Sequence, residues 1–196
     1  YFRFMGRFSS TNWPDGTKEA IKNNANGLAN ISGERIWSEL KQILSGANTG
    51  EIMDAMCELG VSAYTLISCD YIASAERTRQ FTNNPVTIYS SMLTSMDQVA
   101  KAVARFKWSR VEQDLSTFLV QNKGKKYSLE NYQDLLVDGV KLDWIIELVL
   151  LQGNNDIAQK LKSWNIPVFP ITGNDMISKG IKPGKEMGIA MKQLKD

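Results

Sequence analysis

The chain has 196 residues, of which 43% are hydrophobic and 22% charged, so it can bury one or two hydrophobic cores and has the composition of a globular protein. Its 23 basic and 21 acidic residues give a net charge of only +2, which argues neither for nor against a polyanionic partner. The absence of histidine excludes a Ser/His/Asp triad and a Cys/His dyad, and it leaves few ligands for a zinc site.

The two cysteines, Cys57 and Cys69, have apolar neighbours and do not form a CxxC pair, so we expect two buried free thiols in a reducing compartment. No stretch approaches ~20 uncharged apolar residues, so no membrane span is predicted. The chain begins at Tyr1 inside an aromatic and basic run, without an initiator methionine or a targeting sequence. This start predicts a fragment of a longer protein.

Apolar residues recur at spacings of three and four through most of the chain, which predicts an all-α fold. After a Trp-Pro-Asp-Gly turn, cap and stop residues predict helices at residues 17–26, 32–44, 50–59, 70–81 and 85–93. Gly27 is expected to end the first of these in the left-handed conformation. The second should bury one face, made of Ile36, Trp37, Leu40, Ile43 and Leu44.

The longest helix is predicted at residues 95–121, opened by a capping box at Ser95 and Gln98. A basic loop follows, and then helices at residues 128–137, 142–152 and 155–164. Two prolines at residues 167 and 170 predict an extended connector, because each disfavours helix in the residue before it. Beyond this boundary, two short helices are predicted at residues 174–179 and 184–195.

The first of three candidate functional stretches is the aromatic and basic run at residues 1–8. On a helix, Arg3 and Arg7 share one face, and such a like-charge pair destabilises the helix by a few tenths of a kcal/mol. A repelling pair beside an aromatic stripe suggests an anionic partner. The same pattern also fits solvated arginines above a core-facing aromatic stripe.

The second stretch reads Ser-Gly-Glu-Arg-Ile-Trp-Ser-Glu-Leu at residues 32–40. Glu34 suits the positive end of the helix dipole, whereas Arg35 opposes it and needs another reason to be there. One reason is a surface ion pair with Glu39, four residues further along the same face. The alternative is that Arg35 reaches an acidic element elsewhere.

The third stretch is the tail. Gly180, Gly184 and Gly188 leave the start of the last helix bare, so its backbone N–H groups can approach a phosphate, and lysines 179, 182 and 185 surround it. Residues 177–196 hold five lysines against one glutamate and one aspartate. This excess predicts contact with a nucleic-acid backbone. The alternative is a packed helical hairpin with solvated lysines.

A second basic cluster follows the predicted long helix and its loop, and its members are Lys101, Arg105, Lys107, Arg110, Lys123, Lys125 and Lys126. Lys101 and Arg105 lie four residues apart and form part of one stripe, which makes them further candidates for contact with RNA. A solvated helix face is the alternative interpretation.

These stretches together resemble the class II tRNA nucleotidyltransferases, which include the CCA-adding enzymes and the bacterial poly(A) polymerases. Residues 1–7 match the aromatic Arg-Phe continuation of the family's nucleotide-binding helix, and residues 32–40 match its next motif in the neck. The sequence at residues 164–175 and the three tail glycines resemble the family's C-terminal signature. The resemblance covers residues 1–60 and 164–190, and between them only helical content agrees. The animal mitochondrial-type enzymes are the most similar.

The resemblance implies an end of neck at residues 1–60, a helical body at residues 61–165 and a tail at residues 166–196, without the catalytic head. It implies support of the nucleotide-selecting helix by Arg3, Arg7, Glu34, Arg35 and Glu39. It also implies tRNA binding by the tail and body, for which the candidates are Lys101, Arg105, Lys179, Lys182, Gly184 and Lys185.

In this family the head binds Mg²⁺ through an Asp-x-Asp pair, and CTP and ATP are the nucleotide substrates. No such pair occurs here, so the chain by itself is expected to hold no metal and to add no nucleotides. Mitochondrial location is implied, with cytoplasmic or nuclear pools left open. The competing interpretations are an autonomous helical RNA-binding or interaction module and part of a poly(A) polymerase.

Overall fold

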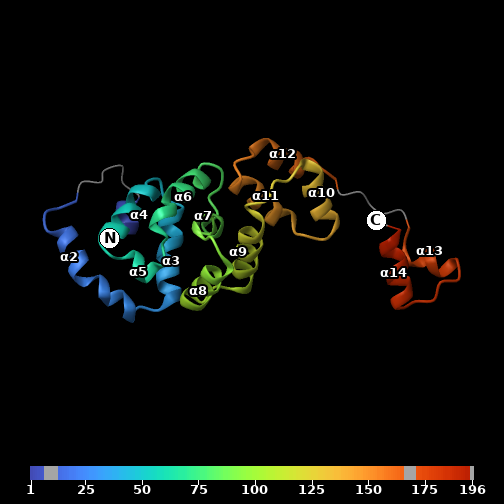
Figure 1. Cartoon of the computed structure of the whole chain (residues 1–196), viewed down its shortest axis with the longest axis horizontal. Coiled ribbons are helices and arrows are strands. Elements are labelled where there is room, and N and C mark those ends of the chain that lie inside the picture. Colours follow the sequence, from blue (N-terminus) through green and yellow to red (C-terminus); the bar gives the residue numbers. More distant parts are fainter. Residues whose placement is uncertain (7–12, 166–170, 195–196) are drawn as a thin grey trace. The chain divides into compact units, whose positions relative to one another are not determined.

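A computed structural model describes residues 1–6, 13–165 and 171–194 of the chain (Figure 1). Every regular element within those ranges is a helix, so the prediction of an all-α fold is confirmed. The chain divides into two compact units, Tyr1–Ser163 and Trp164–Asp196. The predicted extended connector at residues 166–170 lies outside the described residues, and the division into neck and body at residue 60 stays a prediction.

The first part of the larger unit consists of α1 (Phe2–Met5), α2 (Thr17–Asn24), the 3-10 helix η1 (Ala25–Asn30), α3 (Gly33–Leu44), α4 (Thr49–Glu58), α5 (Ser62–Thr65), the 3-10 helix η2 (Cys69–Tyr71) and α6 (Ile72–Arg79). The predicted buried face of α3 is confirmed, since Ile36, Trp37, Leu40, Ile43 and Leu44 are all buried. Gly27 does not stop the first helix in the left-handed conformation; α2 instead continues into η1, which ends at Asn30.

The remainder of this unit consists of α7 (Pro85–Met92), α8 (Met96–Phe106), α9 (Arg110–Asn122), α10 (Leu129–Val137), α11 (Leu142–Leu151) and α12 (Asn155–Ser163). The prediction of one helix over residues 95–121 is wrong. Lys107 adopts the left-handed conformation, with a φ of 53°, and ends α8. Ser109 and Glu112 then form a capping box that begins α9. Trp108, between the two helices, turns into the core and is buried.

An aromatic cluster holds together α3, α7, α8 and the link between α8 and α9. The ring of Trp37 stacks on Phe106 at a centroid distance of 5.6 Å and lies 5.1 Å from Trp108 and 5.5 Å from Tyr89. The Tyr89 side chain is fully buried, and its hydroxyl donates to the carbonyl oxygen of Leu66 at 2.9 Å. Burial raises the pKa of Tyr89, so this residue stays a neutral hydrogen-bond donor.

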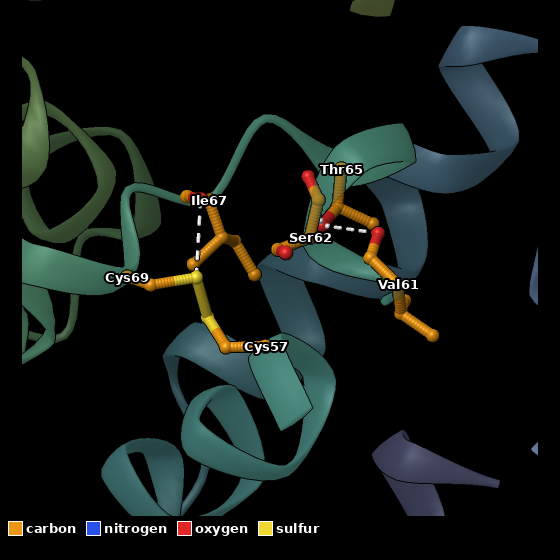
Figure 2. The surroundings of a disulfide bond; sticks show 6 residues. All are labelled: Cys57, Val61, Ser62, Thr65, Ile67 and Cys69. Atoms are coloured by element: carbon orange, nitrogen blue, oxygen red, sulfur yellow. Dashed lines mark hydrogen bonds between the residues drawn. A yellow bond between two sulfur atoms is a disulfide. The ribbon is translucent and has the colours of Figure 1, made fainter. Parts of the chain in front are cut away.

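A disulfide joins Cys57, near the end of α4, to Cys69, at the start of η2 (Figure 2). The expectation of two buried free thiols is therefore wrong, and the reducing compartment inferred from it loses its basis. Cys57 is only half-buried, and Cys69 is exposed. The chain between them turns back through α5 and brings the two Cα atoms to 6.0 Å, within the range that a disulfide spans. Apolar neighbours in the sequence do not reveal that return.

The smaller unit contains α13 (Gly173–Ser178) and α14 (Lys185–Gln193), which contact each other. Thr172 and Asp175 form a capping box at the start of α13. Gly180 ends this helix in a Schellman motif, in which the Ile181 N–H donates to the Met176 carbonyl oxygen at 3.1 Å. The φ of Gly180 is +86°, which favours glycine at this position. The Met176 side chain is buried in this unit.

Candidate nucleic-acid interface

The start of α3 meets the end of α8, and the motif at residues 32–40 contains the residues that allow this contact. Ser32 is the N-cap of α3, and its side-chain oxygen accepts a hydrogen bond from the Arg35 N–H. A Cβ atom on Gly33 would lie 1.6 Å from the carbonyl oxygen of Arg105 and 2.7 Å from its carbonyl carbon. Both atoms belong to the backbone and have little freedom to move. Only glycine therefore fits at residue 33.

Arg105 connects the same helix end to η1. Its guanidinium donates to the carbonyl oxygen of Leu28 at 3.2 Å and to that of Ile31 at 3.3 Å. The side chain is half-buried, so its charge serves contacts inside the fold. Lys101, on the same helix, forms an exposed ion pair with Asp97 at 2.7 Å. Contact of Lys101 and Arg105 with tRNA stays a prediction, and both cations already have protein partners.

Glu39 pairs with an arginine, but its partner is not Arg35. The guanidinium Nη1 of Arg3 lies 3.2 Å from Glu39 Oε1, and this pair joins α1 to α3. Arg35 is exposed and forms no ion pair within the described part of the chain. The two residues expected to pair along one helix face therefore have different environments. Arg7 lies outside the described residues.

Arg3, Arg35 and Glu39 line one cavity of about 460 Å³ between α1, η1, α3 and α5. Most of its other lining is apolar and includes the rings of Tyr1 and Phe2. Both rings contact Trp13, at centroid distances of 4.9 and 5.9 Å. The structure thus brings three of the five predicted neck residues to one place. Glu34 is exposed and does not line this cavity.

Glu112 connects the motif helix α3 to α9, and sequence reasoning missed this role. Its Oε1 accepts from the Trp37 indole at 2.8 Å and from the Lys41 ammonium at 3.3 Å, and its Oε2 accepts from the Ser109 N–H at 2.9 Å. Burial acts to raise the pKa of Glu112, but these hydrogen bonds and the Lys41 charge together hold it below its ordinary value. The Ser-x-x-Glu pattern at residues 109–112 was the signal available in the sequence.

The tail presents its lysines to solvent. Lys179, Lys182 and Lys185 are exposed, and none forms an ion pair among the described residues. Gly184 and Gly188 are exposed and have open space where a Cβ atom would stand. The structure therefore places Lys179, Lys182, Lys185 and Gly184 within one small exposed unit. Among the acidic residues described in this unit, Asp175 accepts hydrogen bonds from the hydroxyl and the N–H of Thr172. These hydrogen bonds lower the pKa of the Asp175 carboxyl group.

Neither a membrane-spanning helix nor a metal-binding cluster is found within the described ranges. None of the helices there is both long and apolar enough to cross a membrane. No group of three or more cysteine, aspartate or glutamate side chains within the same ranges has the arrangement needed to hold a metal ion. The family resemblance implies Mg²⁺ for the catalytic head and none for this chain, and we assign no step to that ion here.

Known proteins match the chain in two ways. Residues 14–67 match a family model described as the probable RNA- and SrmB-binding site of polymerase A. Mitochondrial CCA tRNA nucleotidyltransferase 1 is 33% identical in Mus musculus and 34% in Homo sapiens, in each case over 100% of this chain and 49% of the relative. The CCA-adding enzyme of Levilactobacillus brevis is 23% identical over 98% of this chain and 52% of the relative. The chain thus spans about half the length of these relatives.

Proposed function

We infer the function from a premise that the comparisons supply: the chain belongs to the family of CCA-adding tRNA nucleotidyltransferases and corresponds to the C-terminal half of its relatives. In the proposed function, this chain is the tRNA-holding part of an enzyme that adds CCA to the 3′ ends of tRNA from CTP and ATP. The match of the whole chain to animal CCA-adding enzymes is the observation that carries the proposal. These animal relatives are mitochondrial enzymes by name, which supports a mitochondrial location for the parent enzyme.

The tail binds the tRNA backbone in this proposal. Its three exposed lysines form no ion pair among the described residues, and Gly184 and Gly188 leave open space beside the start of α14. Each lysine that contacts a phosphate releases a condensed counterion, so affinity depends steeply on salt. Such contacts hold a particular shape of RNA and carry little information about base identity.

The start of α3 supports the nucleotide-selecting helix in this proposal. The ion pair between Arg3 and Glu39 joins the end of that helix to α3, and Gly33 and Arg105 fix α3 against the rest of the fold. These residues position other groups and touch no reacting atom. In the proposed parent enzyme, Mg²⁺ and the phosphoryl-transfer step belong to the catalytic head, and this chain alone adds no nucleotides.

The tail is tested by the triple substitution Lys179→Ala/Lys182→Ala/Lys185→Ala in the 196-residue chain. The affinity for tRNA is measured between low and moderate salt. The slope of log affinity against log salt should flatten by about 2 to 3, because each lost phosphate contact removes roughly one. Circular dichroism should show unchanged helical content.

The matched control is Lys22→Ala/Lys160→Ala/Lys162→Ala, which removes the same charge from exposed lysines on α2 and α12. Its effect on the slope should be much smaller. Equal slopes for the tail variant and the parent chain would show that the tail is a packed hairpin and does not hold RNA.

A poly(A) polymerase is the second candidate, because the matching family model is described from polymerase A. The two activities are separated by incubating the full-length protein with tRNA that lacks its CCA end, in the presence of CTP and ATP. A product longer by three nucleotides, ending in CCA, supports the first candidate. A long adenosine tail that forms without CTP supports the second.

A further inference from the structure

A second cationic region lies in the larger unit. A cavity of about 840 Å³ is bordered by α6, the end of α11 and the loop between α9 and α10. Its lining includes the cations Arg77, Lys123, Lys125 and Lys126, and no aspartate or glutamate occurs among the described lining residues. The chain as a whole is nearly neutral, so four cations without an acidic residue form a strongly biased local composition. Such a cavity attracts an anion.

Two of the four cations serve the fold. The Lys123 ammonium donates to the carbonyl oxygens of Ser90 at 3.0 Å and Ser91 at 2.9 Å, and also to that of Leu93. It thereby satisfies carbonyl groups at the end of α7, and burial lowers its pKa to about 8. Lys125 donates to the side-chain oxygen of Asn122 at 2.9 Å.

The other two cations are available to a ligand. The side chains of Arg77 and Lys126 are exposed, and neither forms an ion pair or hydrogen bond within the described part of the chain. Both line the cavity, Arg77 from α6 and Lys126 from the loop after α9. Arginine can bind a phosphate with two parallel hydrogen bonds, and lysine acts on it as a point charge.

Hydrogen bonds hold the loop that carries Lys126. The Gln152 side-chain amide donates to the carbonyl oxygen of Lys125 at 2.9 Å and to that of Lys123 at 3.2 Å. The Tyr127 hydroxyl donates to Asn122 at 2.7 Å. A cationic loop fixed in this way loses less conformational entropy when an anion binds.

The lining also offers an aromatic ring. Tyr71 borders the cavity and is 42% exposed, so part of its ring faces solvent. Unpaired bases of RNA stack on such rings, whereas an inorganic anion gains nothing from them. Hydroxyl groups of Ser74 and Thr94 add hydrogen-bond partners for phosphate or ribose. Cations and an exposed ring together favour a nucleotide-containing polyanion over a simple anion.

From these observations we propose that the cavity bounded by Arg77 and Lys126 is a second RNA-binding site, which takes backbone phosphates of the tRNA independently of the tail. This inference rests on the proposed function, because it takes tRNA as the partner. It assigns the RNA contact of the larger unit to the cavity, and it gives Lys101 and Arg105 no part in that contact.

The test is Arg77→Gln/Lys126→Gln, which removes both available charges and leaves the hydrogen-bonded loop residues unchanged. The slope of log tRNA affinity against log salt should flatten by about 1.5 to 2, with affinity at least tenfold weaker at low salt. The matched control is Lys18→Gln/Arg110→Gln, which removes one lysine and one arginine that pair with Glu58 and Asp114 elsewhere. The control should keep the parent slope.

Three outcomes separate the two proposals. If the parent chain does not bind tRNA, the proposed function fails. If the parent binds tRNA but Arg77→Gln/Lys126→Gln keeps its affinity and salt slope, the cavity proposal alone is overturned. Calorimetry with ATP and with inorganic phosphate distinguishes the source of the phosphate. Binding of ATP that is lost in the double variant while the tRNA slope stays unchanged would make the cavity a nucleotide site and would also overturn the proposal.

Discussion

At the start of α3, small and charged residues of one motif contact the rest of the fold, whereas in the tail the residues of the candidate site face solvent. Gly33 lies against backbone atoms of α8, and Glu39 pairs with Arg3. Gly188 has open space around it, and Lys182 has no ion-pair partner among the described residues. A sequence motif can thus be specific because close packing allows only certain residues at its positions. A binding surface is instead recognised by charged side chains that have no partner within the fold.

The largest effect is expected at Gly33, where the packing is tightest. Gly33→Ala places a Cβ atom 1.6 Å from a backbone oxygen, so α3 and α8 must separate. We expect the free energy of unfolding to fall by about 3 kcal/mol or more, measured by urea denaturation. Gly188→Ala in α14 is the matched control, and it should be neutral or stabilise the tail by up to about 1 kcal/mol. Equal effects at the two glycines would remove the contrast between the regions.

The next largest effect is expected at the disulfide, which stabilises the larger unit as the Gly33 contact does. Cys57→Ser/Cys69→Ser opens a loop whose ends are separated by 12 residues in the sequence. Loop-closure entropy predicts a loss of about 3 kcal/mol in the free energy of unfolding. Thermal unfolding of the parent chain with and without a reducing agent provides the measurement, and the double variant should not respond to the agent. An unchanged midpoint in the reduced parent would count against the disulfide.

Glu112 gives a smaller and pH-dependent effect. Because the folded state lowers its pKa, its contribution to stability is present in full above the unfolded value of about 4.5 and is lost as the pH falls through the folded value. Glu112→Gln should cost about 1 to 2 kcal/mol at neutral pH and should reduce the loss of stability on acidification. Chemical denaturation at several pH values between 3 and 7 checks this sign. A variant with the parent's pH profile would refute the network with Trp37 and Ser109.

The all-α class and the buried face of α3 could be predicted from the spacing of the hydrophobic residues, because that spacing indicates which residues face a core. The break between α8 and α9 could not be predicted in this way. The apolar positions continue at helical spacing across Lys107, while its left-handed backbone changes the direction of the chain. The capping box at Ser109 was the overlooked local signal.

The candidate site could be predicted only in part, because the sequence shows which residues are charged but not which of them have partners in the fold. Clusters of lysine in the tail can be read directly from the sequence, because exposed charges need no partner. The partner of Glu39 lies 36 residues earlier, on α1, and the partners of Arg105 are the carbonyl oxygens of Leu28 in η1 and of Ile31 just after it. The available charges of the cavity come from Arg77 and Lys126, on segments far apart in the chain. Only the fold brings such residues together.

The most direct test of the central claim is competition for the chain between labelled tRNA and two unlabelled RNAs of equal length, one a folded tRNA and the other unstructured. If the chain holds tRNA by shape and backbone charge, the folded tRNA should displace the label at a concentration at least about tenfold lower than the unstructured RNA requires. This difference should not depend on the base sequence of the tRNA. Equal displacement by the unstructured RNA, or no binding of labelled tRNA at low salt, would contradict the assignment of this chain as a tRNA-holding module.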